Sequence, residues 1–110
     1  MDSLISKILK FTQDRDWDKF HNPKDLAISI SIEANELLEC FQWKPNDDLS
    51  NFDVDAIGDE IADVYVYLLM LCNKLNIDIN NVANEKLEKN SIKYPIEKCK
   101  GSSAKYTCLS

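Results

Sequence analysis

The sequence has few residues that turn or interrupt a polypeptide chain: it contains two glycines and three prolines among 110 residues. A many-stranded sheet needs frequent turns, so this scarcity favours long helices. No stretch approaches 18 consecutive apolar residues, which argues against a membrane-spanning helix. Residues 1–11 are followed by charge rather than by a small-residue cleavage site, so we expect a soluble, cytoplasmic protein.

Histidine and paired cysteines are also scarce. The chain has one histidine, His21, and its four cysteines show no C-x-x-C spacing, so we expect no zinc site. Di-iron helical bundles need more than one histidine for their E-x-x-H motifs and are excluded on the same ground. No phosphate-binding loop, calcium loop or serine nucleophile motif is present. We expect Cys40 and Cys72 to be small core side chains within helices.

The charge is uneven along the chain, whose net charge is −6. Residues 1–83 carry 7 basic and 16 acidic side chains, whereas residues 84–110 carry 6 basic and 3 acidic ones. The predominantly acidic body argues against nonspecific binding to a nucleic-acid polymer. The basic end either lies against the acidic body or closes over an anionic ligand held there.

Hydrophobic periodicity and capping residues predict four helices within about 90 residues. Asn22-Pro23 marks the start of the second helix, because asparagine caps free N–H groups and proline suits the first helical position. Residues 14–21, before it, are expected to be an irregular connection. The predicted helices span residues 4 to about 15, 22 to about 43, a start between 49 and 55 to about 76, and 78 to 93.

The third predicted helix has the most regular pattern, because its apolar residues recur every three or four positions. They are Ile57, Ile61, Val64, Leu68, Leu71 and Leu75. Such a seam is typical of a helix in a bundle, so we predict an all-α, four-helix-bundle fold for residues 1–95, with residues 96–110 as a flexible basic tail. A bundle this small buries little surface alone, and we therefore expect a dimer or a dimer of dimers.

Two acidic pairs are the most informative feature of the sequence. Glu33 and Glu36 lie three residues apart on the second predicted helix, and Glu60 and Asp63 have the same spacing on the third. Residues at this spacing project from one helix face, and both pairs flank the apolar stripes through which the helices pack. Crowded carboxylates need a compensating ion, and oxygen-only ligation suits Mg²⁺, or alternatively Mn²⁺, with phosphate oxygens as further ligands.

Aromatic side chains gather near the predicted ends of the acidic helices. Trp17 lies in a polar connection and Trp43 at a helix end, where core packing explains a large aromatic less easily. Stacking on a nucleobase is worth roughly 1–3 kcal/mol per base, enough to help hold a nucleotide. Tyr67 lies four residues after Asp63 and shares its helix face. The alternative role of these aromatics is to close the ends of the bundle or to form a dimer interface.

The acidic motifs resemble the signature of the all-α nucleoside triphosphate pyrophosphohydrolases, the MazG-like superfamily. They are Glu33-Ala-Asn-Glu36-Leu-Leu-Glu39 and Glu60-Ile-Ala-Asp63-Val. Flanking motifs extend the resemblance over nearly the whole chain, to the dCTP pyrophosphatase branch: Arg15-Asp16-Trp17, Phe20-His21, Phe41-Gln42-Trp43-Lys44, Lys93-Tyr94-Pro95 and residues 102–107. One departure is Ile8, which stands where dCTP-preferring relatives have a histidine.

The resemblance implies Mg²⁺-dependent hydrolysis of a deoxynucleoside triphosphate, dCTP or a modified dCTP, to the monophosphate and pyrophosphate. It implies that Glu33, Glu36, Glu60 and Asp63 hold the metal and that Glu36 or Glu39 activates the attacking water. The implied substrate contacts are Lys86 and Asn90 on the phosphates, with Lys86 assisting catalysis, and Trp17, His21, Trp43 and Tyr67 around the base and sugar. Lys93, Tyr94 and Lys105 complete the implied site.

Two alternatives remain open on the sequence. Within the same chemistry, the substrate is dUTP or a broad range of nucleoside triphosphates. In a different class, the chain is a non-catalytic helical module whose acidic face binds a basic partner and whose aromatics form an oligomer interface.

Overall fold

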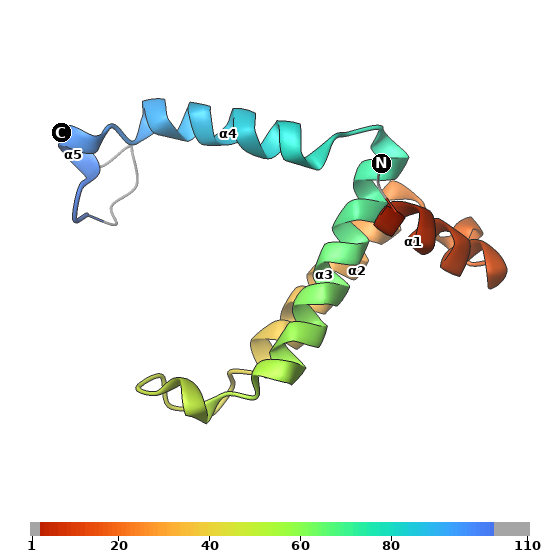
Figure 1. Cartoon of the computed structure of the whole chain (residues 1–110), viewed down its shortest axis with the longest axis horizontal. Helices are drawn as coiled ribbons and strands as arrows, with labels where there is room; N and C mark the ends of the chain where they lie inside the picture. Colours follow the sequence, from red (N-terminus) through yellow and green to blue (C-terminus); the bar gives the residue numbers. More distant parts are fainter. Residues whose placement is uncertain (1–2, 103–110) are drawn as a thin grey trace. The chain divides into compact units, whose positions relative to one another are not determined.

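The computed structural model describes residues 3–102, which form helices and no strands (Figure 1). This confirms the all-α prediction. The elements are α1 (Ser3–Asp14), the 3₁₀ turn η1 (Asp18–Phe20), α2 (Pro23–Glu39), the 3₁₀ turn η2 (Leu49–Asn51), α3 (Val54–Leu75), α4 (Ile79–Lys93) and α5 (Ile96–Cys99). The chain divides into two compact units, the first ending at Ile77 and the second beginning at Asp78. Among the described helices, none is long and apolar enough to cross a membrane.

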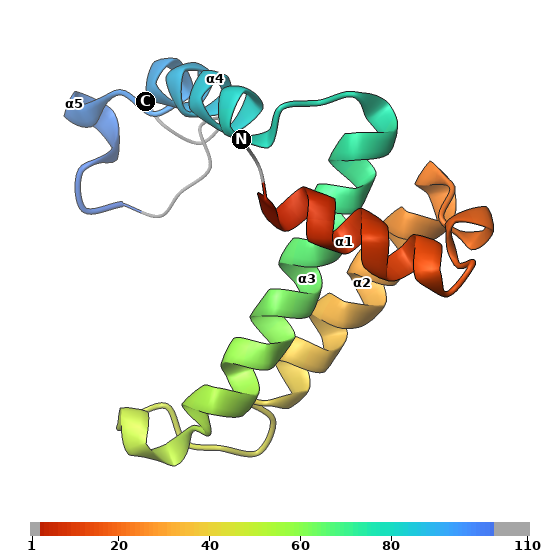
Figure 2. The same ribbon diagram turned by 45° about the vertical axis from the view of Figure 1, so that its right-hand side comes forward.

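The first unit is built on an antiparallel pair of helices. α2 and α3 run side by side, and α1 crosses them near one end, where it contacts α3 (Figures 1 and 2). Leu26 of α2 is fully buried, and the other buried side chains are Ile8 and Thr12 of α1 and Leu69 and Met70 of α3. The core of this unit therefore lies where the three helices meet.

Side-chain caps explain why the long helices begin where the sequence predicts. The side chain of Asn22 accepts a hydrogen bond from the backbone N–H of Asp25 at 2.9 Å, at the start of α2. Asp53 and Asp78 cap α3 and α4 in the same way. Asn76, with φ of 57°, adopts the left-handed conformation that ends α3. These starts, and the end of α3, agree with the predicted bounds.

The predicted end of the second helix was wrong by about four residues. α2 ends at Glu39, and the chain then turns through Cys40 to Trp43, which has φ of 67°. The ring of Phe41 packs against that of Phe52, with centroids 5.0 Å apart. This contact holds the chain near the start of α3. The spacing of apolar residues along a helix cannot predict such a contact between two segments.

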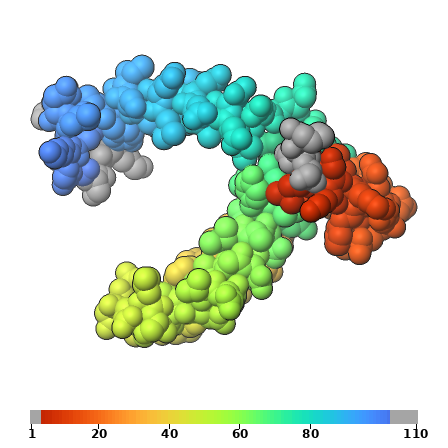
Figure 3. All heavy atoms as spheres, viewed as in Figure 1, coloured from red at the N-terminus to blue at the C-terminus, as the bar shows by residue number. Residues whose placement is uncertain are grey.

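The apolar seam of α3 is only partly covered within the first unit. Ile61 is 52% exposed and Leu75 is 49% exposed. Figure 3 shows a side of α3 that is covered by neither α1 nor α2. Cys40 and Cys72 are half-buried free thiols rather than the core side chains we predicted. The unit thus leaves a large part of its apolar surface in solvent.

The second unit consists of α4 and the short helix α5. Residues 96–99, within the segment that the sequence predicts as a flexible tail, form a helical turn after Pro95. Residues 103–110 lie outside the described part of the chain, and the flexibility of the tail stays a prediction. The predicted domain boundary at residue 95 also stays a prediction.

Candidate metal centre and adjoining pocket

Helices α2 and α3 bring the two acidic pairs together. Each of Glu33, Glu36, Glu60 and Asp63 offers one carboxylate oxygen, and these four oxygens all lie within 4.8 Å of one another. We call this group the carboxylate quartet. Within each pair the residues lie on successive turns, so the antiparallel packing of α2 on α3 places the two pairs face to face.

The electrostatics of the quartet disfavour four negative charges in the absence of a cation. Burial, followed by the neighbouring carboxyl group of Glu36 and the charges of Asp63 and Glu60, raises the pKa of Glu33 to about 7. Burial and the charge of Glu36 also raise the pKa of Glu60. The pKa of the Tyr67 hydroxyl is raised by burial first and then by Glu33. The site therefore concentrates negative charge that a bound cation would stabilise.

Two buried oxygen atoms show that the quartet fits a divalent cation. Oε2 of Glu33 and Oε2 of Glu60 are buried and have no hydrogen-bond partner. A buried carboxylate oxygen without a partner is costly, and coordination of a cation removes that cost. The donors are all carboxylate oxygens, the ligand type that hard cations such as Mg²⁺ prefer.

We expect the metal-free protein to lose thermal stability as the pH rises from about 5 to 8. Glu33 has a pKa of about 7 in the folded chain against an ordinary value of 4.5. Between these values the folded state holds a proton that the unfolded state releases, so stability falls as the pH rises. Melting curves by circular dichroism in EDTA measure this. Glu33→Gln should flatten the dependence, and a wild-type melting temperature that rises over this interval contradicts the assignment.

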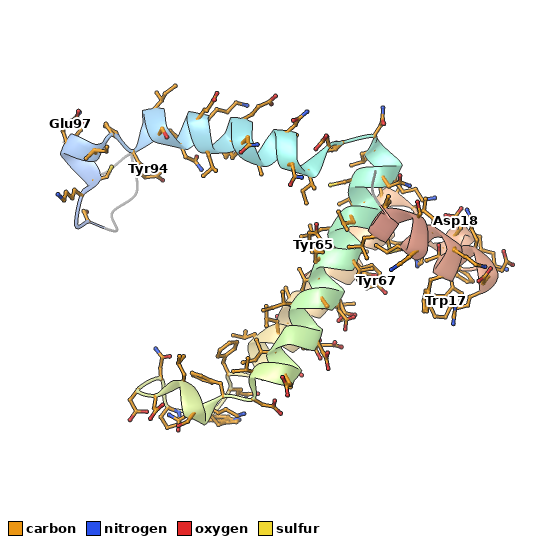
Figure 4. All side chains as sticks on the ribbon, viewed as in Figure 1. Trp17, Asp18, Tyr65, Tyr67, Tyr94 and Glu97 are labelled. Carbon is orange, nitrogen blue, oxygen red and sulfur yellow. The ribbon has the colours of Figure 1, made fainter. Side chains whose placement is uncertain are left out.

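A pocket of about 370 Å³ adjoins the quartet, within the roughly 300–1,000 Å³ typical of small-molecule sites. Its walls come from α1, the 15–22 connection and α3, and they are mostly apolar. The lining residues are Lys7, Ile8, Phe11, Thr12, Trp17, His21, Asp63, Val66, Tyr67 and Met70. Figure 4 shows Trp17 and Tyr67 on the side of α3 that faces α1, with Tyr65 on the opposite side.

The aromatic side chains of the pocket are held edge to face. The ring of Trp17 meets that of Phe11 at 73° with centroids 5.7 Å apart, and the guanidinium of Arg15 lies 3.7 Å above the centre of the Phe11 ring. His21 meets Tyr67 at 89° with centroids 6.4 Å apart. Nδ1 of His21 is buried and has no hydrogen-bond partner among the described residues.

Two further predicted site residues of the first unit, Trp43 and Glu39, lie outside this pocket. Trp43 is 92% exposed in the connection after α2. Glu39 is the last residue of α2 and borders a separate hollow with Leu38 and Phe41. The other predicted contacts lie in the second unit or beyond the described residues: Lys86, Asn90 and Lys93 on α4, Tyr94 at its end, and Lys105 in the part that is not described.

Comparison with known proteins identifies the family. The sequence matches the MazG-like family over residues 28–109. The chain belongs to the MazG-like family. This confirms the resemblance that the acidic motifs indicated. The matched region begins within α2 and includes both pairs of the quartet.

Relatives of this MazG-like chain include proteins named dCTP pyrophosphatase 1. Those from Bos taurus and Homo sapiens are each 33% identical over 105 residues, which is 91% of this chain and 62% of the relative. The chain thus spans less than two thirds of their length. Among solved structures, a pyrophosphatase from Archaeoglobus fulgidus is 43% identical, with a TM-score of 0.78, covering 84% of this chain and 89% of that one.

Sequence reasoning missed part of the pocket of this MazG-like protein. Lys7, Phe11 and Thr12 line it, although none was a predicted site residue. Their spacing, with Ile8, places them on adjoining turns of α1. This spacing was the only feature of the sequence that could have indicated that they share a face. Whether that face meets a ligand depends on how α1 crosses α3, which the sequence pattern does not specify.

Proposed function

We propose that this protein hydrolyses a deoxynucleoside triphosphate, dCTP or a modified dCTP first among them, to the monophosphate and pyrophosphate. The observation that carries the proposal is that Asp63 belongs both to the quartet and to the wall of the pocket. A ligand with an anionic end and a flat apolar end fits such a composite site. The names of the MazG-like relatives, dCTP pyrophosphatase 1 and a pyrophosphatase, support the same chemistry.

In this proposal the pocket holds the nucleoside and the quartet lies beside the phosphates. Trp17 stacks on the face of the base or contacts its edge, and stacking is worth roughly 1–3 kcal/mol. Nδ1 of His21, which lacks a partner, binds a polar group of the base or sugar. Tyr67, four residues from Asp63, borders the sugar between the two halves of the site.

Glu33, Glu36, Glu60 and Asp63 are the residues that would hold Mg²⁺, with Mn²⁺ as the alternative. Bound there, the ion would neutralise triphosphate charge and lower the pKa of a nearby water. In this proposal the carboxylate of Glu36, a member of the quartet, orients that water or accepts a proton from it. Glu39, one turn further along and exposed, is the alternative base.

The base preference depends on few polar groups. Ile8, which the resemblance sets against a histidine of dCTP-preferring relatives, is buried in the pocket wall, and its side chain offers a base no hydrogen bond. A mostly apolar pocket discriminates weakly between similar bases. A dUTP-directed or broad-range activity is therefore the alternative within the same reaction.

We further propose that the working enzyme is a homodimer or homotetramer. Trp43, Ile61 and Leu75 are among the large apolar side chains that the single chain leaves exposed, and burying them favours self-association. Trp43 remains a proposed base contact. Lys86, Asn90, Lys93, Tyr94 and Lys105 remain proposed contacts to the substrate, the lysines through its phosphates.

A panel of nucleotides tests the proposed activity. The protein is incubated with Mg²⁺ and dCTP, 5-methyl-dCTP, dUTP, dTTP, dATP or dGTP, and orthophosphate is measured with and without added inorganic pyrophosphatase. We expect orthophosphate only when the pyrophosphatase is added, and most from the cytosine nucleotides. Equal signals across the panel indicate the broad-range alternative, whereas orthophosphate without the added enzyme contradicts pyrophosphate release.

A further inference from the structure

The connection between α1 and α2 places two pocket side chains, Trp17 and His21, on a short exposed segment. Its backbone turns at Asp16, whose φ of 54° lies in the left-handed region. The N–H of Trp17 donates to the carbonyl of Thr12 at 3.0 Å, and the N–H of His21 donates to the carbonyl of Asp18 at 3.0 Å. These bonds shape the segment locally, but they do not attach it to α3, which forms the opposite wall of the pocket.

An ion pair makes that attachment. Nζ of Lys74, in the last turn of α3, donates to Oδ1 of Asp18 at 2.9 Å across 56 positions of sequence. The Lys74 side chain is 31% exposed, less than either side chain of the α1 pair Lys10–Asp14. The hydrogen bond and the positive charge of Lys74 lower the pKa of Asp18 below its ordinary value.

Each member of the ion pair lies next to residues that line the pocket. Asp63, Tyr67, Met70 and Lys74 follow one another at intervals of four, three and four residues, so they lie on one face of α3. That face therefore carries, in order, a quartet residue, two pocket residues and the lysine. Asp18 directly follows Trp17, and its carbonyl accepts the N–H of His21, so fixing Asp18 also limits the positions of both pocket side chains.

We propose that Asp18 and Lys74 are a positioning pair, which holds the 15–22 connection against α3 and keeps Trp17 and His21 in the pocket wall. This inference rests on the proposed function, since it assigns the connection to nucleotide binding. Neither residue lines the pocket. The pair acts on substrate affinity and leaves the chemistry at the quartet unchanged.

Kinetics of single and double variants test the pair. Asp18→Asn and Lys74→Met should each raise KM roughly two- to fivefold, the effect of losing one partly exposed ion pair, with kcat unchanged. The double variant should be no worse than either single one, because the first substitution already removes the interaction. Lys74→Arg should keep the wild-type KM. The matched control is Lys10→Met, which breaks an ion pair of the same 2.9 Å length on α1 and should leave KM unchanged.

Amide hydrogen exchange separates this inference from the proposed function, because it needs no substrate. Exchange of the 15–22 segment should be faster in Asp18→Asn and Lys74→Met than in the wild type or Lys10→Met. Unchanged exchange, additive KM effects or a fall in kcat equal to the rise in KM overturns the positioning role and leaves the proposed function standing. If the wild type hydrolyses no nucleotide while the variants exchange faster, the proposed function fails and the attachment of the connection is upheld.

Discussion

The Glu36→Gln variant is expected to release pyrophosphate at least about a hundredfold more slowly than the wild type, with an unchanged helical circular dichroism spectrum. Glutamine keeps the shape of the side chain but removes one of the four anionic oxygen donors. The charge of Glu36 contributes to the raised pKa of both Glu33 and Glu60, so its loss also relieves repulsion and should not unfold the site. Steady-state pyrophosphate release from the best substrate of the panel measures the effect.

Asp55→Asn supplies the matched control for this variant. Asp55 lies in the first turn of α3, is exposed and lies outside the quartet, so the substitution makes the same change of charge elsewhere on the acidic surface. We expect wild-type turnover from it. If Glu36→Gln retains turnover within tenfold of this control, the quartet does not carry the reaction.

Local signals predicted most of the helix bounds. Asn22, Asp53 and Asp78 are capping residues whose side chains bond to N–H groups only three positions away, so their effect is visible in the sequence. The end of α2 is different, because it depends on the packing of Phe41 against Phe52 across a connection. Contacts of that kind depend on the path of the chain in space, so residue spacing in the sequence does not predict them.

The candidate site likewise has one part that the sequence predicts and one part that it does not. The two acidic pairs could be found because a spacing of three residues on each helix decides which side chains share a face, and only the pairing of α2 with α3 had to be added. The pocket wall on α1 could not be found, since Phe11 and Thr12 reach it only through the crossing of α1 over α3. The pairing of Asp18 with Lys74 was missed for the same reason.

Loss of ion binding is the second large effect that we expect. Glu33 supplies one of the two buried oxygen atoms without a partner, and Asp63 joins the quartet to the pocket. Changes to residues that merely support metal ligands already cost about 10- to 100-fold in metal affinity, so the loss of a ligand should cost at least about tenfold. Glu33→Gln and Asp63→Asn are the informative variants, again with Asp55→Asn as the control.

Electron paramagnetic resonance of Mn²⁺, titrated with the protein in the absence of nucleotide, tests the metal centre most directly. Free Mn²⁺ gives a signal that binding removes, so the titration reports affinity without any turnover. We predict binding by the wild type and by Asp55→Asn, weakened at least about tenfold in Glu33→Gln and in Asp63→Asn. Equal affinity in all four proteins would contradict the assignment of the quartet as the metal site.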